Sequence, residues 1–87
     1  MAFVEIYTKD YCPFCTKAKM LLEQLNVDFQ EIDLSVSPEK YDELQVRRPG
    51  ARTVPQIFIN DQGIGGCDDL YALYEAGTLK PMLDELE

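Results

Sequence analysis

The stretch FVEIYTKDYCPFCTKAKMLLEQL, residues 3–25, sets the fold of this chain. Its first six residues are mostly β-branched or aromatic, which predicts a buried strand over residues 3–8. Apolar side chains then recur at the i, i+3, i+4 and i+7 spacing of an amphipathic helix, at Ala18, Leu21, Leu22 and Leu25. We expect this helix to begin near Pro13, because proline lacks an N–H that the first helical turn leaves unpaired, and to end at Asn26. A strand therefore leads directly into a helix that starts with a Cys-x-x-Cys motif.

The middle of the chain predicts a second strand, a second helix and a hairpin. Residues 28–34 read as a strand, and Ser37 followed by Pro38 predicts a helix start, with Tyr41 and Leu44 facing inward. Pro49-Gly50 should end that helix. Residues 56–59 predict a third strand, and residues 60–63 predict a turn into a short fourth strand around Ile64.

Two more helices complete the pattern. Asp68 or Asp69 can cap a helix that ends at Gly77, and Thr78 can cap a last helix. The apolar positions of the last helix are Leu79, Met82, Leu83 and Leu86. The order is β-α-β-α-β-β-α-α, with a right-handed crossover between the first two strands and helices on both faces of the sheet. This pattern predicts a single α/β domain over residues 1–87.

Composition excludes several classes of function. The 87 residues carry 8 basic and 16 acidic side chains, a net charge of −8, which a nucleic-acid backbone would repel. This acidic surface keeps a protein in solution or attracts a basic partner, and composition does not separate the two. The absence of histidine excludes Ser-His and Cys-His hydrolases. The chain shows neither a secretory leader nor a stretch of about 18 apolar residues, so we expect a cytoplasmic protein that is not in a membrane.

The Cys12-Pro13-Phe14-Cys15 motif predicts a redox site. Free N–H groups and the positive end of the helix dipole stabilise a thiolate, and cysteines so placed have pKa values of roughly 3.5 to 7.5, against about 8.5 for a free cysteine. Cys12 lies at the helix end where substrate can meet it, and Cys15 lies one turn deeper on the same face. Lys9 adds positive potential nearby. The alternatives are zinc binding, which lacks the further ligands it needs, and two packing cysteines, which does not account for a pair around a proline at a helix start.

Val54-Pro55 precedes the third strand and predicts a second part of the site. The residue before proline is held extended, so Val54 presents its N–H and C=O as a sheet edge does. A cis bond there would aim these groups at Cys12, but the sequence does not distinguish cis from trans. The alternative is a strand that simply begins with proline.

Gly65-Gly66-Cys67-Asp68-Asp69 is a glycine turn at a helix start. Its free N–H groups suit a carboxylate, and an aspartate beside them suits an ammonium group, which is the chemistry of the γ-glutamyl end of glutathione. The alternative is plain helix capping by Asp68 or Asp69. Cys67 itself we interpret as a small, partly buried side chain rather than a third catalytic thiol.

Taken together in this order and spacing, four blocks resemble the glutaredoxin family, in particular its small bacterial dithiol members. They are Lys9, Cys12-Pro13-Phe14-Cys15, Thr53-Val54-Pro55-Gln56 and Gly65-Gly66-Cys67-Asp68-Asp69. The resemblance implies the thioredoxin fold, a four-stranded mixed sheet flanked by helices on both faces, with a cis Pro55 beside Cys12.

The resemblance also implies a glutathione groove. Thr53 and Val54 would pair with the backbone of the tripeptide, and the helix start at Cys67 would hold its γ-glutamyl end. Lys9 and one of Arg47, Arg48 or Arg52 would hold its glycine carboxylate. Phe14 stands where the family usually has tyrosine and keeps the aromatic wall. The glutathione-binding set implied in this way is Lys9, Phe14, Thr53, Val54, Pro55, Gly66, Cys67 and Asp68.

The implied activity is glutathione-dependent reduction of protein disulfides and glutathione mixed disulfides, with Cys12 and Cys15 as catalytic residues. Glutathione would act as a co-substrate, with no tightly bound cofactor and no metal. We expect a monomer whose partners are disulfide-containing or glutathionylated proteins. The alternatives are a redoxin reduced by thioredoxin reductase, against which the segment starting at Cys67 argues, and an iron–sulfur cluster carrier, against which Cys15 argues. A domain that only binds a partner would have an unreactive Cys12.

Overall fold

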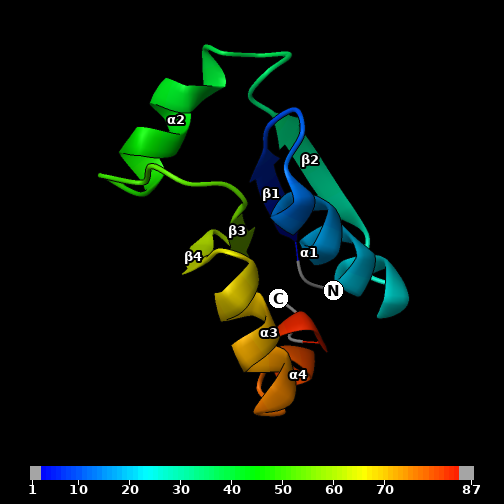
Figure 1. Ribbon diagram of the computed structural model, residues 1–87. Helices are drawn as coiled ribbons and strands as arrows, with labels where there is room; N and C mark the ends of the chain where they lie inside the picture. Colours follow the sequence, from blue (N-terminus) through cyan, green and yellow to red (C-terminus); the bar gives the residue numbers. More distant parts are fainter. Residues whose placement is uncertain (1–2, 85–87) are drawn as a thin grey trace.

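Eight elements follow one another in the predicted order (Figure 1). The computed structural model describes residues 3–84. The strands and helices are β1 (Val4–Thr8), α1 (Pro13–Gln24), β2 (Phe29–Asp33), α2 (Lys40–Arg47), β3 (Gln56–Ile59), β4 (Gln62–Gly65), α3 (Cys67–Glu75) and α4 (Leu79–Asp84). No helix in this described part is long and apolar enough to cross a membrane.

The four strands form one mixed sheet in the order β2-β1-β3-β4. β1 pairs in parallel with β2, ending at the partners Thr8 and Asp33, and both β1–β3 and β3–β4 are antiparallel. Because β3 runs opposite to β1, the loop that leaves β1 and the loop that enters β3 lie at the same end of the sheet. The topology therefore brings the Cys-x-x-Cys segment next to the Val54-Pro55 segment.

Successive side chains of β1 and β3 point to opposite faces of the sheet, and they contribute to two apolar clusters, one on each face. One face packs under α1, α3 and α4 around Ile6, Leu22, Leu70 and Leu79. The other face packs under α2 and contains Tyr7, Leu34, Leu44, Ala51 and Phe58. Figure 1 shows α2 apart from the other three helices, which confirms the prediction of helices on both faces.

Asn26 and Gly77 end their helices as predicted. Both residues have positive φ values, 59° and 77°, in the region that asparagine and glycine enter most readily. After Gly77, the Thr78 N–H donates to the Leu73 carbonyl at 2.9 Å, which closes a Schellman motif. The Val27 N–H closes the same motif on the Leu22 carbonyl at 2.9 Å.

Two predicted helix starts were wrong. α2 begins at Lys40 rather than at Ser37 and Pro38, because the chain first makes a tight turn in which the Lys40 N–H donates to the Ser37 carbonyl at 3.0 Å. α3 begins at Cys67, with Gly66 as N-cap, earlier than an N-cap at Asp68 or Asp69 would place it. The predicted capping by an aspartate is nevertheless confirmed for Asp69, whose carboxylate accepts the Gly66 N–H from the third helical position.

Two other details differ from the predictions. Tyr41 is 40% exposed instead of facing inward, because Leu44 alone fills the contact of α2 with the sheet and the Tyr41 hydroxyl reaches the Ala51 carbonyl at 3.4 Å. The hairpin turn is confined to Asn60 and Asp61, since both have positive φ and Gln62 already belongs to β4. The predicted contribution of Leu86 to the last helix lies outside the described residues.

Candidate active site

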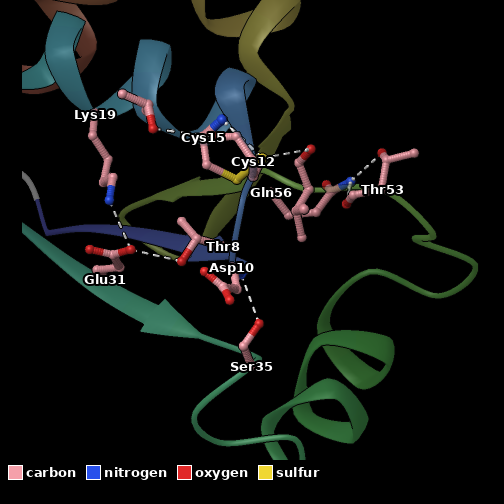
Figure 2. Close-up of a disulfide and its surroundings, with 11 residues drawn as sticks. Thr8, Asp10, Cys12, Cys15, Lys19, Glu31, Ser35, Thr53 and Gln56 are labelled. Carbon is pink, nitrogen blue, oxygen red and sulfur yellow. Dashed lines mark hydrogen bonds and ion pairs between the residues drawn. A yellow bond between two sulfur atoms is a disulfide. The ribbon is translucent and has the colours of Figure 1, made fainter.

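The two cysteines lie at the start of α1, where the structure joins them in a disulfide (Figure 2). Cys12 is the N-cap, with extended φ and ψ of −131° and 96°, and Pro13 is the first helical residue. The Cys12 Sγ accepts the Cys15 N–H at 3.0 Å, so a sulfur takes the place that a serine or aspartate oxygen fills in other helix caps. Cys15 is buried and Cys12 is half-buried, so only the first sulfur is open to a substrate.

The Val54-Pro55 bond is cis, as the resemblance implies. The carbonyl oxygen of Val54 lies 3.8 Å from the Cys12 Sγ. The peptide before Pro55 therefore faces the reactive sulfur across the end of the sheet.

The Gln56 side chain supports the loop before Pro55 through hydrogen bonds on its buried side. It is only 6% exposed, and its Nε2 donates to the Thr53 carbonyl at 2.9 Å and lies 3.3 Å from the Thr53 Oγ1. Its Oε1 has no hydrogen-bond partner among residues 3–84. Sequence reasoning placed Gln56 in the motif but gave it no role in the site.

A groove of about 420 Å³ runs from Phe14 to the start of α3. Its lining includes every residue of the implied glutathione set except Lys9, which is exposed and lies outside it. The residues that sequence reasoning left out of that set are Arg48, Gln56, Gly65 and Asp69. The Gly65-Gly66 pair is the signal that could have pointed to Gly65 and Asp69, because a glycine turn at a helix start leaves little room for side chains.

The turn that leads into α3 requires that Gly65 has no side chain. Gly65 has φ +111°, and a Cβ there would collide with the Asp69 carboxylate. The Gly66 N–H donates to the Asp69 Oδ2 at 2.9 Å, so Asp69 serves the helix end from its third position. Asp68 is exposed on the groove and leaves its carboxylate available to a ligand.

Cys67 is 5% exposed, which confirms that it is a buried side chain. Burial raises its pKa, the nearby Lys17 opposes that rise, and Asp68 adds to it. Cys67 is therefore a protonated thiol near neutral pH, even though it too stands at a helix start, because burial disfavours its thiolate.

The three candidate arginines occupy different places. The Arg47 guanidinium is paired with two carboxylates away from the groove: its Nη2 lies 2.7 Å from the Glu5 Oε1 in β1 and 2.8 Å from the Asp61 Oδ1 in the hairpin turn. Arg48 lines the groove, with its Nη1 against Gly63. Arg52 is exposed and outside the lining. Of the three candidate arginines, Arg48 is thus the one that lines the groove.

The described residues contain no group of three or more Cys, Asp or Glu side chains that could hold a metal ion. What the fold and the site define is a thiol–disulfide oxidoreductase of the thioredoxin fold, in which one accessible sulfur stands at a helix end opposite a cis-proline peptide.

Comparison with known proteins shows to which family of thiol–disulfide oxidoreductases the chain belongs. The glutaredoxin family profile matches residues 4–64. Glutaredoxin 3 of Escherichia coli strain K12 is 54% identical over 83 residues, which cover 95% of this chain and 99% of that protein. The chain belongs to the glutaredoxin family, whose members are thiol–disulfide oxidoreductases.

Solved structures agree with the fold. The solution structure of glutaredoxin from Brucella melitensis has a TM-score of 0.82 at 47% identity, covering all of this chain and 96% of that one. The crystal structure of a buckwheat glutaredoxin–glutathione complex has a TM-score of 0.80 at 35% identity, covering 94% of this chain and 76% of that one.

Proposed function

We propose that Cys12 is the nucleophile of a glutathione-dependent disulfide reductase and that Cys15 is its resolving partner. The observation that carries this assignment is the Cys12 Sγ at the helix cap, 3.0 Å from the Cys15 N–H, while Cys15 is buried behind it. A negatively charged sulfur at Cys12 gains from that N–H and from the helix dipole.

The reaction begins when the Cys12 thiolate attacks one sulfur of a substrate disulfide. A new S–S bond forms to Cys12, the substrate S–S bond breaks, and the second substrate sulfur leaves as a thiolate that takes up a proton. In the dithiol route the Cys15 thiolate then attacks the Cys12 sulfur, which releases the reduced substrate and leaves the Cys12–Cys15 disulfide. Two glutathione molecules reduce that disulfide and become glutathione disulfide. In the monothiol route Cys12 carries glutathione, and a second glutathione attacks the glutathione sulfur and regenerates the Cys12 thiolate.

Glutathione would lie in the groove beside Cys12. Val54 would offer its backbone groups to the tripeptide, and so would Thr53, which Gln56 holds through its carbonyl. The free N–H groups at the start of α3 suit the γ-glutamyl carboxylate, and Asp68 suits its ammonium group. The buckwheat relative, whose structure contains glutathione, supports this groove.

The remaining groups of the set complete the site. Arg48 lines the groove and would take the glycine carboxylate, with Lys9 reaching it from the β1–α1 loop. Pro55, Gly66 and Cys67 shape the floor, and Phe14, which is 58% exposed, forms the outer wall. We further propose a cytoplasmic, monomeric single domain that acts on disulfide-containing or glutathionylated proteins without a tightly bound cofactor.

The test compares turnover of a glutathione mixed disulfide by the wild type, Cys15→Ser and Cys12→Ser, with glutathione, glutathione reductase and NADPH. We expect activity in the wild type and in Cys15→Ser, because the monothiol route needs only Cys12, and none in Cys12→Ser. Activity in Cys12→Ser would identify another cysteine as the nucleophile. An inactive wild type that thioredoxin reductase can reduce would instead place the protein with the thioredoxin-type redoxins.

A further inference from the structure

The four-residue loop between β1 and α1 contains a backbone conformation that its sequence does not favour. Tyr11, directly before Cys12, has φ +50°, in the left-handed region that side chains other than glycine, asparagine and aspartate rarely enter. Its own side chain is 92% exposed and does not hold it there. A conformation of this kind persists only where the surrounding structure fixes the chain on either side.

The chain after Tyr11 is fixed by α1, because Cys12 is its N-cap. The chain before Tyr11 is fixed by Ser35 in the turn after β2: the Asp10 N–H donates to the Ser35 Oγ at 2.7 Å (Figure 2). Tyr11 is therefore the single residue between two anchored neighbours.

Ser35 is itself held in place by the end of the parallel ladder. The β1–β2 pairing ends at Thr8 and Asp33, and the Leu34 N–H extends it to the Thr8 carbonyl at 2.8 Å. The Ser35 N–H donates to the Asp33 Oδ1 at 2.8 Å. This turn aims the Ser35 hydroxyl at Asp10, where it accepts a hydrogen bond as the next carbonyl of a ladder would.

We propose that Ser35 is a positioning residue for the nucleophile, acting through the Asp10 N–H to hold the Tyr11 conformation that places Cys12 at the helix cap. Without the Ser35 hydroxyl, Tyr11 returns to a negative φ. That change moves the Cys12 Sγ relative to the Cys15 N–H and the Val54 carbonyl. The inference uses from the proposed function only the assignment of Cys12 as nucleophile.

The test measures the rate at which iodoacetamide labels Cys12 in the reduced protein as a function of pH, with mass spectrometry to identify the labelled cysteine. For Ser35→Ala we expect a higher Cys12 pKa and a labelling rate at pH 6 lower by about two- to tenfold, the range expected for loss of one hydrogen bond. The substitution changes no charge, so a pKa change reports the position of Cys12. Ser35→Thr retains the hydroxyl and should restore the wild-type profile.

The matched control is Ser37→Ala, in the same turn, since no hydrogen bond joins the Ser37 side chain to residues 3–84. We expect its labelling profile to equal that of the wild type. A wild-type Cys12 pKa in Ser35→Ala would overturn the inference, even if the melting temperature fell, because Ser35 would then have only a structural role.

A double-mutant comparison tests the part played by Tyr11. Glycine adopts a positive φ without steric cost, so Ser35→Ala should lower the labelling rate less in a Tyr11→Gly background than in the wild type. An equal reduction in both backgrounds would remove the Tyr11 conformation from the explanation. Labelling requires no glutathione, so failure of the mixed-disulfide assay would count against the proposed substrate and leave the role of Ser35 to be judged by these rates.

Discussion

Arg47 fastens α2 to the sheet, and replacing it with methionine should destabilise the protein by about 2 kcal/mol. The substitution keeps an apolar stem over the Phe58 ring, where the guanidinium carbon lies 3.9 Å from the ring centroid, and it removes all charged contacts. Leu44 is the one buried residue of α2, so polar contacts hold much of the helix in place. Beside Arg47 they include the Tyr7 hydroxyl, which donates to the Glu43 Oε1 at 2.8 Å.

The contacts of Arg47 contribute unequally. The bond to Asp61 contributes little, because that carboxylate is 88% exposed and solvent screens it. The bond to Glu5 joins side chains that are 17% and 15% exposed, and the Tyr7 hydroxyl lies 3.0 Å from the Arg47 Nη1. Hydrogen bonds to charged groups contribute roughly 1.5 to 3 kcal/mol, and residual water at Glu5 reduces the penalty of leaving it unpaired, which gives about 2 kcal/mol. Hydrogen bonding to Glu5 raises the pKa of Arg47, so the guanidinium stays charged throughout the accessible pH range.

The assay is urea unfolding of the reduced protein, followed by far-ultraviolet circular dichroism, for the wild type, Arg47→Met and Arg52→Met. Arg52 is exposed, so its replacement should change the free energy of unfolding by less than about 0.5 kcal/mol. A loss below about 0.5 kcal/mol for Arg47→Met as well would refute the argument. A cycle with Glu5→Gln should show coupling between the two residues, since they share one hydrogen bond.

Three further predictions concern the groove. Gly65→Ala should lower the free energy of unfolding by about 1 to 3 kcal/mol in urea melts, because a Cβ at φ +111° meets the Asp69 carboxylate; wild-type stability would show that the turn can shift. Arg48→Met should raise the KM for a glutathione mixed disulfide about tenfold and leave kcat nearly unchanged, whereas a fall in kcat alone would remove Arg48 from binding. Cys67 should resist iodoacetamide until the pH exceeds the usual range for cysteine, because burial raises its pKa. The stability that this raised pKa contributes is complete below the pKa of the unfolded thiol and is lost as the pH rises through the native value, which urea melts at pH 7 to 10 would detect.

The sequence predicts the elements of the fold because local patterns encode them. Runs of β-branched and aromatic residues mark β1 and β3, in which Ile6 and Ile57 are buried. The apolar spacing marks α1, and Asn26 and Gly77 mark helix ends through the positive φ that their types allow. The start of α2 was misplaced because Ser37 and Pro38 favour a cap and a first turn equally well in a tight turn before the helix.

The residues of the candidate site also differ in how far local sequence patterns reveal them. The Cys-x-x-Cys pair and most of the groove follow from contiguous motifs. Arg48 does not, because Arg47 has the same chemistry and only the direction of each side chain from α2 separates them. Ser35 gives no signal at all, since its importance arises from the adjacency of two loops that lie 25 residues apart.

The antiparallel arrangement of β1 and β3 has a consequence for the making of the protein. Cys12 faces Val54, 42 residues further along the chain, so the ribosome exports both cysteines well before the segment that will cover them. A growing chain can form local structure around β1 and α1 early, but it cannot complete the environment of the sulfur until β3 has been synthesised and docked. The nascent dithiol is thus chemically available to oxidants and to other thiols before its selectivity exists, and reducing conditions are what would keep both cysteines as thiols during that interval.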